Sequence, residues 1–323
     1  MQSREVSWTL GETTVCGTVV RPEGVGPFPG VAFVAGSGPT DRDWDSPLLP
    51  GRNGSAKLLA EALAQARIAS VRYDKRASGP HVRETIPLLI GKLSMQSHLD
   101  ELAGAVRVLA GEDYVREDRI FGLGNSEGTL HVLNYALSDD RPPFAGLVLT
   151  GPPGRNVGDV SRAQLAAQAA AVPGGTELLG LYDTSIARFL AGEPVAPDPA
   201  LPEGVVNLLR SLENPANLPF ARELWTADAA APLARVTVPA LVIIGEKDLQ
   251  VDWQADGEVL QEAAKGRENV SFLFPENANH VLKYEPRPRA ELNQAEVMAR
   301  YNADDAELDP ETVTAIVTWL ARN

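Results

Sequence analysis

Short apolar runs rich in β-branched residues recur along the chain, and Gly or Pro bounds several of them. The runs are residues 30–35, 68–73, 119–123, 145–150, 240–244 and 269–274. Continuous apolar runs of this length are typical of strands buried on both faces of a parallel sheet. Two β-rich segments at 4–10 and 13–20, separated by Gly11 and Glu12, predict a hairpin that precedes them.

Apolar residues at helical spacing follow most of these strands. The predicted helices span residues 55–67, 96–110, 252–265 and 310–321, and another begins near Ser126. Ser55 and Asp252 are the expected N-caps, because their side-chain oxygens can accept the free N–H groups of a first turn. The alternation of buried strands with helices predicts an α/β fold, with helices on both faces of a mostly parallel central sheet.

The alternation stops between about residues 155 and 235. This stretch contains helical patterns only, at 161–172, 176–191, 203–213 and 217–226. Because it separates two strands of the sheet, we interpret residues 155–235 as a helical cap inserted in a core formed by residues 1–154 and 236–323. The alternative is an extra helical layer without a functional role.

Charge and composition exclude several classes of partner. Lys and Arg total 29 and Asp and Glu total 43, so the net charge is −14. An acidic chain lacks the clustered cations that nucleic acids and anionic membranes require, and we expect neither partner. The single cysteine, Cys16, excludes a disulfide framework and a cysteine-based metal cluster. No secretory signal or 18-residue apolar span is visible, so we expect a cytoplasmic protein.

The pentapeptide at 124–128 (GNSEG) carries the sharpest chemical signal. It matches G-x-S-x-G, and it lies between a predicted strand and a predicted helix. A serine on such a tight strand-to-helix turn projects its hydroxyl above the sheet, and the flanking glycines let strand and helix pass closely. Ser126 is therefore the candidate nucleophile. The alternative is a structural glycine-rich turn.

A serine nucleophile needs a general base, and the chain has four histidines. In chains with this serine turn, the acid and then the histidine follow the serine in sequence. His81 and His98 precede Ser126, and His131 lies on its helix, roughly 140° around the axis from it. We interpret His81 as a loop residue and His98 and His131 as helix-face residues. His280 is therefore the candidate general base, and it lies in a loop directly after a strand.

The acid must orient the imidazole and stabilise its cation. Asp248 follows the strand at 240–244 and so lies at the carboxyl edge of the sheet, where sites in open α/β sheets form. Asp252 is the competing candidate, although it is better interpreted as a helix N-cap. Glu246 is a weaker third candidate.

Two backbone N–H groups usually hold the oxyanion of a tetrahedral intermediate. The N–H of Glu127, directly after the serine, is one candidate. The second is the N–H of Ser37, in the glycine-flanked loop at 36–39 that follows the strand at 30–35. The alternative for this loop is an ordinary Gly/Pro turn. The charged segments 41–43 (DRD) and 73–76 (YDKR) are interpreted as ion-pair sets that order their loops.

These motifs resemble the α/β-hydrolase superfamily. GNSEG, GEKD (245–248) and NANH (277–280) occur in the superfamily's order, and GSGPTDRD (36–43) with RYDKRASG (72–79) is similar to a subgroup of bacterial carboxylesterases often grouped with serine aminopeptidase-type hydrolases. The resemblance implies an α/β-hydrolase fold, a triad of Ser126, Asp248 and His280, and an oxyanion hole at Ser37 and Glu127. Ala35 departs from the pattern, since many members have His there.

The hypothesis is a serine hydrolase that cleaves small or medium acyl esters through an acyl-enzyme. This mechanism needs no metal or organic cofactor, and the expected partner is a small-molecule ester. An amidase or peptidase, a thioesterase, an acyltransferase and a non-catalytic ligand-binding relative remain alternatives. The oligomeric state is left open.

The predicted cap supplies candidates for the wall of the substrate pocket. Apolar side chains on its helices are expected to contact the acyl chain, and the loop at 44–49, with Trp44, is expected to close another side. The cap candidates are Leu181, Tyr182, Phe189, Leu208, Leu209 and Trp225. Some of them are expected to pack within the cap instead.

Overall fold

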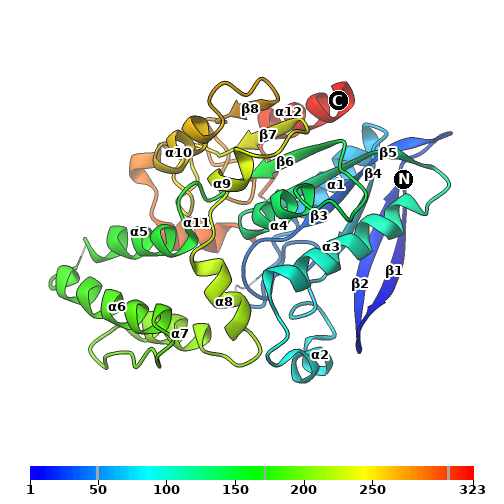
Figure 1. Cartoon of the computed structure of the whole chain (residues 1–323). Helices are drawn as coiled ribbons and strands as arrows, with labels where there is room; N and C mark the ends of the chain where they lie inside the picture. Colours follow the sequence, from blue (N-terminus) through cyan, green and yellow to red (C-terminus); the bar gives the residue numbers. More distant parts are fainter. Residues whose placement is uncertain (49–50, 171, 304–305) are drawn as a thin grey trace.

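The computed structural model describes residues 1–48, 51–170, 172–303 and 306–323, and within them it forms one sheet of eight strands (Figure 1). The strands are β1 (Gln2–Leu10), β2 (Thr13–Arg21), β3 (Phe28–Val34), β4 (Ala69–Tyr73), β5 (Val115–Asn125), β6 (Gly146–Thr150), β7 (Ala240–Ile243) and β8 (Val270–Leu273). Their order across the sheet is β1-β2-β4-β3-β5-β6-β7-β8. β2 is antiparallel to β1 and β4, and the other neighbours are parallel, which confirms the predicted fold class.

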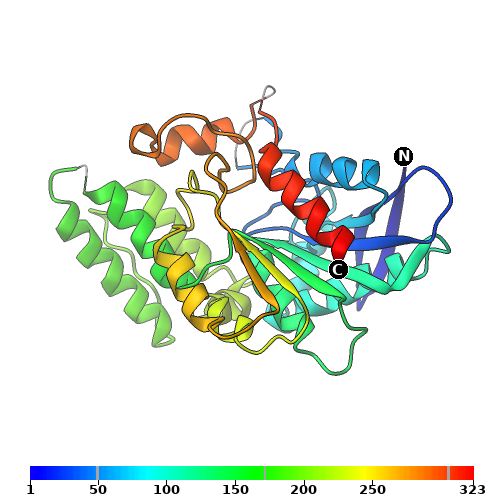
Figure 2. The same cartoon turned by 90° about the horizontal axis from the view of Figure 1, so that it is seen from above.

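Helices cover both faces of the sheet (Figure 2). α1 (Ser55–Gln65) and α12 (Pro310–Arg322) share a hydrophobic cluster with one face. α3 (Met95–Ala110), α4 (Glu127–Ala136) and α10 (Ala255–Ala263) pack in a second cluster on the other face. The remaining helices outside the predicted cap are α2 (Val82–Leu89), the short η1 (Arg289–Glu291) and α11 (Gln294–Arg300).

Strand β3 shows why the central strands are apolar at every position. Val31 and Phe33 belong to the cluster beneath α1, whereas Ala32 and Val34 belong to the cluster beneath α3, and all four are at most 1% exposed. Because successive side chains of a strand point to opposite faces, a strand covered on both sides must be apolar at both registers.

Between β6 and β7 the described residues form helices only. They are α5 (Val157–Ala169), α6 (Gly175–Leu190), α7 (Glu203–Leu212), α8 (Leu218–Trp225) and the short α9 (Ala230–Leu233). Side chains of α5–α8 share a hydrophobic cluster of their own, and Figure 1 shows α5, α6 and α7 to one side of the sheet. α9 instead packs against α4 and α10. The division into core and cap stays a prediction.

Three local predictions were wrong or incomplete. Ser55 is the first residue of α1 rather than its N-cap, because Gly54 precedes the helix with a φ of 65°. Asp252 accepts the N–H groups of Gln254 and Ala255 as expected, although α10 begins at Ala255. The sequence patterns missed α2, which contains Pro87. None of the helices in the described part of the chain combines the length and apolarity that crossing a bilayer requires.

Candidate active site

Ser126 lies at the turn between β5 and α4, as predicted. Its backbone has φ 54° and ψ −123°, a conformation that non-glycine residues rarely adopt and that is found at strained functional positions. Backbone hydrogen bonds hold the turn: Ser126 N donates to Thr150 O (2.8 Å), and Thr129 N donates to Ser126 O (3.0 Å). The turn therefore fixes the serine at the carboxyl ends of β5 and β6.

The two glycines of the pentapeptide have no room for a side chain. A Cβ on Gly124 would lie 2.4 Å from the carbonyl oxygen of Gly128, and a Cβ on Gly128 would lie 2.4 Å from the carbonyl oxygen of Val34. Both contacts are with backbone atoms, which cannot move aside without displacing helix α4 or strand β3. The close passage of helix and strand thus depends on glycine at both positions.

His280 and Asp248 form a buried acid–base pair. His280 Nδ1 is 2.7 Å from Asp248 Oδ2, and the two side chains are 5% and 1% exposed. The other carboxylate oxygen of Asp248 accepts the N–H groups of Gln250 (2.8 Å) and Val251 (2.9 Å). The carboxylate is therefore fixed from both sides, and its bond to Nδ1 leaves Nε2 as the free ring nitrogen.

The competing acid has a different set of contacts. One carboxylate oxygen of Asp252 accepts the N–H groups of Gln254 and Ala255 at the start of α10, and the other pairs with Arg289 Nη2 (2.8 Å). The same Arg289 donates to the carbonyl oxygens of Glu246 and Asp248, each at 2.6 Å. Asp252 and Arg289 thus brace the loop that carries Asp248, and sequence analysis did not identify Arg289.

Asn125 connects the serine turn to the histidine loop. Its Nδ2 donates to the carbonyl oxygen of His280 (3.0 Å) and to Thr150 Oγ1 (3.2 Å). A Cβ on Gly151 would lie 3.1 Å from the His280 ring, so this glycine leaves the ring its space. Sequence analysis missed both roles, because the partners are far apart along the chain.

The predicted oxyanion loop lies against the serine turn. A Cβ on Gly36 would lie 3.2 Å from the Cβ of Ser126, and the next residue, Ser37, is exposed. The ammonium of Lys75, which follows β4, donates to the carbonyl oxygen of Gly36 (2.6 Å) and to Glu127 Oε1 (2.9 Å). Lys75 therefore connects the loop of Ser37 with the residue after Ser126.

A buried network of charged and polar groups extends from this lysine. His131 Nε2 is 3.2 Å from Glu127 Oε1, and His98 Nδ1 is 3.0 Å from Glu101 Oε2. Burial lowers the pKa of His131 to about 4. Burial alone would raise the pKa of Glu127, but the charge of Lys75 and the hydrogen bond with His131 outweigh it and lower that pKa. The two histidines thus lie on helix faces, as predicted, and these faces are buried in the core.

One group in the described residues has the side-chain types and spacing of a metal site. Ligand atoms of His98, Glu127 and His131 lie within 4.8 Å of one another. However, Glu127 already pairs with the ammonium of Lys75, and a cation bound there would be repelled by that charge. We therefore interpret the group as part of the buried charge network.

The charged segments after β3 and β4 are ion-pair sets, as predicted. Arg42 donates three hydrogen bonds to Asp74, from its backbone N (2.9 Å), Nε (3.1 Å) and Nη2 (2.7 Å). Arg72 Nη2 pairs with Asp43 (3.0 Å), and Arg76 Nε pairs with Glu101 (2.7 Å). The bonds of Arg42 and Arg72 tie the segment after β3 to β4 and its end, whereas Arg76 joins the turn that carries Lys75 to α3.

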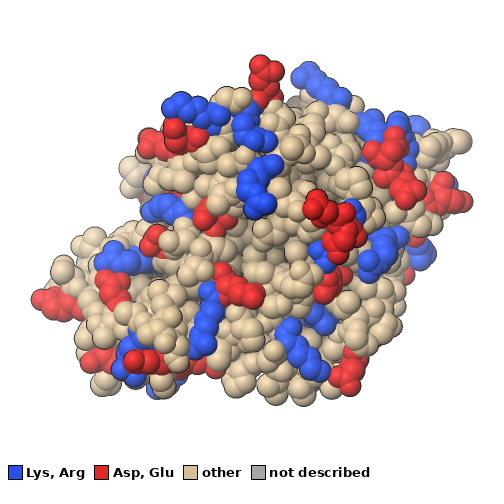
Figure 3. Space-filling view, in the orientation of Figure 1, with Lys and Arg blue, Asp and Glu red and all other residues tan. Residues whose placement is uncertain are grey.

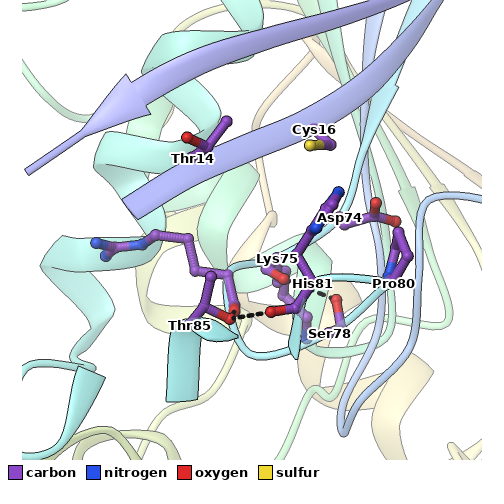
Figure 4. Close-up of a pocket in the computed structure, with 9 residues that line it drawn as sticks. Thr14, Cys16, Asp74, Lys75, Ser78, Pro80, His81 and Thr85 are labelled. Atoms are coloured by element: carbon purple, nitrogen blue, oxygen red, sulfur yellow. Dashed lines mark hydrogen bonds between the residues drawn. The ribbon is translucent and has the colours of Figure 1, made fainter. Parts of the chain in front are cut away.

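A small pocket of about 10 Å³ lies beside this turn (Figure 4). Thr14 and Cys16 of β2 form one side, and Asp74, Ser78 and His81 lie on the other. Burial raises the pKa of the Cys16 thiol, so the sulfur is not an activated nucleophile. The pocket is too small for a substrate.

Most of the predicted substrate-contacting side chains are buried in hydrophobic clusters. Tyr182, Phe189 and Trp225 are 1%, 0% and 7% exposed in the cluster shared by α5–α8, and Leu181 is half-buried against it. Trp44, 4% exposed, packs against Phe33 in the cluster beneath α1. Of the loop at 44–49, residue 49 lies outside the described residues. That the predicted side chains contact the substrate stays a prediction.

An apolar cavity of about 280 Å³ lies within α5–α7 and the segment before α7. Its lining includes Leu165, Leu178 and Val205, and none of the predicted cap candidates. On the face that Figure 3 shows, acidic and basic side chains are interspersed over the sheet region and the helices to its side. This face therefore offers no single-sign patch of the kind that binds a polyanion.

Comparisons with known proteins agree with the geometry. A model of the alpha/beta hydrolase family matches residues 31–295. Esterase EstD of Thermotoga maritima is 30% identical over 271 residues, which cover 82% of this chain and 57% of that protein. The chain thus spans just over half the length of this curated relative.

Solved structures share the fold at low sequence identity. The Pyrococcus furiosus esterase Pf2001 has a TM-score of 0.56 at 16% identity, covering 99% of this chain and 90% of that one. The alpha/beta hydrolase GrgF from Penicillium sp. sh18 has a TM-score of 0.55 at 16% identity, covering 100% and 99%. At such identity, the likeness concerns the fold alone.

Proposed function

This chain belongs to the alpha/beta hydrolase family, and we propose that it is a serine-dependent carboxylic ester hydrolase with the triad Ser126, Asp248 and His280. The 2.7 Å contact between His280 Nδ1 and Asp248 Oδ2 is the observation that carries the proposal. It holds the imidazole in the tautomer whose Nε2 can accept a proton. The name of the 30% identical relative, esterase EstD, supports an ester as the substrate.

The proposed reaction has two halves. Ser126 Oγ attacks the ester carbonyl carbon while His280 Nε2 takes the hydroxyl proton, and the tetrahedral intermediate collapses when that proton passes to the leaving alcohol. Water then attacks the acyl-enzyme with His280 again as the base, which releases the carboxylic acid and restores Ser126. Asp248 stabilises the imidazolium in both halves.

The N–H groups of Ser37 and Glu127 are the proposed oxyanion donors. The approach of Gly36 to Ser126 supports this assignment, because it brings the next N–H near the site of attack. Donors fixed before the reaction stabilise the developing negative charge without reorganising. Every catalytic group in the proposed mechanism is a side-chain or backbone group of this chain.

We propose that residues 155–235 determine the substrate specificity, acting as a cap over the core of residues 1–154 and 236–323. The separate hydrophobic cluster of α5–α8 supports a cap that folds as a unit of its own. Its helices, with Trp44 on another side, would form an apolar wall for a small or medium acyl chain. The partner is then a small-molecule ester.

A fluorophosphonate probe tests the proposal directly. The wild-type chain should be labelled at Ser126, and it should hydrolyse p-nitrophenyl esters in a panel that also contains the matching amide and thioester. Ser126→Ala is the control that should abolish both signals. A folded wild-type chain without labelling and without ester turnover would rule out the proposed function, whereas turnover confined to the amide or the thioester would change its substrate class.

A further inference from the structure

Lys75 is a buried cation whose contacts lie on both sides of the proposed oxyanion hole. Its side chain is 5% exposed, and its ammonium donates to Gly36 O (2.6 Å) and to Glu127 Oε1 (2.9 Å). Neither the triad chemistry nor the packing of β4 requires a lysine here. A buried charge carries a desolvation cost, so its partners indicate what it does.

The first contact fixes the direction of a peptide plane. The carbonyl of Gly36 and the N–H of Ser37 belong to the same peptide unit, and in a trans peptide these two groups point in opposite directions. Holding the carbonyl oxygen on the ammonium therefore directs the Ser37 N–H away from Lys75. The positive charge also polarises this peptide, which strengthens its N–H as a hydrogen-bond donor.

The second contact acts on the other proposed donor. The carboxylate of Glu127 is 2% exposed and lies between Lys75 and His131, so the first residue of α4 is held from its side chain. The N–H of the same residue is the donor beside the nucleophile. One ammonium thus ties both halves of the oxyanion hole to each other.

The turn that carries Lys75 is itself braced. Ser78 N and Ser78 Oγ both donate to the carbonyl oxygen of Lys75, at 2.8 and 2.9 Å, and Thr85 Oγ1 donates to the carbonyl oxygen of Arg76 (2.6 Å). Figure 4 shows Ser78 and Thr85 on either side of this turn. The ammonium is consequently held in place before substrate arrives.

We infer that Lys75 is a positioning residue of the oxyanion hole: its bond to Gly36 O orients the Ser37 N–H, and its bond to Glu127 fixes the second donor. The inference rests on the proposed function. Losing one oxyanion donor lowers kcat by about 10²- to 10³-fold in a serine protease, so misaligning one should lower it by about 10- to 100-fold.

The test uses charge-balanced double variants, because removing one partner of a buried ion pair destabilises the fold. Lys75→Met with Glu127→Gln removes the ammonium and its bond to Gly36. The matched control is Arg76→Met with Glu101→Gln, which removes the neighbouring buried pair (2.7 Å). In both pairs the carboxylate also contacts a histidine. The two double variants therefore differ in the bond to the predicted oxyanion loop, which only Lys75 makes.

For a short p-nitrophenyl ester, kcat/KM should fall at least about 10-fold in the Lys75 double variant and stay within about 3-fold of wild type in the Arg76 control. The Ki of an alkylboronic acid, whose tetrahedral adduct places an oxygen in the oxyanion hole, should rise in parallel. The Ki of the product alcohol should not change. Thermal melting shows which variants are folded.

Glu127→Gln alone separates the two contacts. It leaves the ammonium on Gly36 O, so its loss in kcat/KM should be smaller than that of the double variant. If the single variant loses as much as the double variant, or if the Lys75 and Arg76 double variants behave alike, the inference is overturned. If the Met-containing variant does not fold, Lys75→Gln with Glu127→Gln takes its place, with the same expected and opposing results.

The outcomes also distinguish this inference from the proposed function. A wild-type chain that is labelled at Ser126 and hydrolyses esters, beside a Lys75 double variant of equal activity, would overturn the inference alone. A folded wild-type chain that is neither labelled nor active would overturn both.

Discussion

The carboxyl edge of the sheet and the helices α5–α8 both contain buried side chains, yet they are built in opposite ways. At the sheet edge, backbone geometry constrains the candidate nucleophile: Ser126 has a positive φ, and Gly124 and Gly128 have no space for a Cβ. In α5–α8, apolar side chains such as Phe189 and Trp225 pack on one another.

The two regions should differ in how well they tolerate amino-acid substitutions. A close backbone contact admits one residue type, because carbonyl groups and strands cannot shift independently. A hydrophobic cluster accepts substitutions that keep volume and polarity, since packing adjusts at modest cost. We therefore expect large, position-specific effects at the sheet edge and graded effects in α5–α8, and the predictions below test that contrast from the largest effect to the smallest.

The triad should show the largest effects. Ser126→Ala and His280→Ala should each lower kcat by about 10⁴-fold or more, and combining them should add little, because triad residues act as a unit. Asp248→Asn should lower kcat by about 10⁴-fold, since an amide favours the wrong imidazole tautomer. Steady-state kinetics on a p-nitrophenyl ester measures each loss.

Asp252→Asn is the matched control for the acid. The substitution keeps a side-chain oxygen that can accept the N–H of Ala255 at the start of α10, but it weakens the ion pair with Arg289. We expect a loss in kcat of about 10-fold or less. A crippling effect of Asp252→Asn together with a mild effect of Asp248→Asn would reverse the assignment of the acid.

Glycine substitutions contrast the two regions directly. Gly128→Ala should prevent formation of the serine turn, because the new Cβ would lie 2.4 Å from a carbonyl oxygen of β3. Gly180→Ala, on α6, meets no atom within 4 Å and should raise the free energy of unfolding by about 0.5–1 kcal/mol through helix propensity. Urea denaturation and fluorophosphonate labelling of both variants measure the contrast. Normal labelling of Gly128→Ala would contradict it.

The same contrast decides what could be predicted from sequence. The sequence identified candidates for the triad, namely Ser126, Asp248 and His280, because each follows a strand. The strand-turn-helix order also constrains local backbone geometry. The parallel strands were recognisable as continuous apolar runs because both of their faces are covered. These signals are local, and the sequence contains them directly.

The contacts that were missed join segments far apart in the chain. Lys75 meets Gly36 and Glu127, and Asn125 meets the His280 loop, through bonds that no spacing rule describes. The segment 73–76 was recognised as an ion-pair set, but its partners depend on how β4 lies beside β3. The short α2 was missed because it contains Pro87, which argues against a helix in local patterns.

Acid should destabilise the core through His131. Burial lowers its pKa to about 4, so between pH 6.5 and 4 the unfolded chain binds more protons than the folded chain. This contribution to stability is complete above pH 6.5 and is lost as the pH falls toward 4, by about 3 kcal/mol. Urea denaturation at pH 7 and pH 4.5 should show a smaller loss in His131→Gln than in wild type.

The control lies in α6, whose Ser185 is the one buried polar side chain in the described part of residues 155–235. Ser185→Ala should keep the wild-type dependence on pH. The comparison between variants is needed because burial raises the pKa of Asp41 to about 6, which acts with the opposite sign between pH 4 and 6. If the free energy of unfolding depends on pH equally in His131→Gln and in wild type, His131 does not cause the acid destabilisation.

The last prediction concerns acyl-chain length. If α6 forms part of the substrate wall, Leu181→Ala and Phe189→Leu should shift the preferred chain length, since each buried methylene contributes about 0.8 kcal/mol, or about 4-fold in kcat/KM. The measurement is kcat/KM for p-nitrophenyl esters from acetate to octanoate, with labelling of Ser126 as a check that the nucleophile is intact. Phe144→Leu is the matched control, because Phe144 is equally buried but packs against Tyr135 in the core. It should keep the wild-type profile. If the α6 variants keep it as well, α5–α8 are an extra helical layer, and specificity resides at the sheet edge with the chemistry.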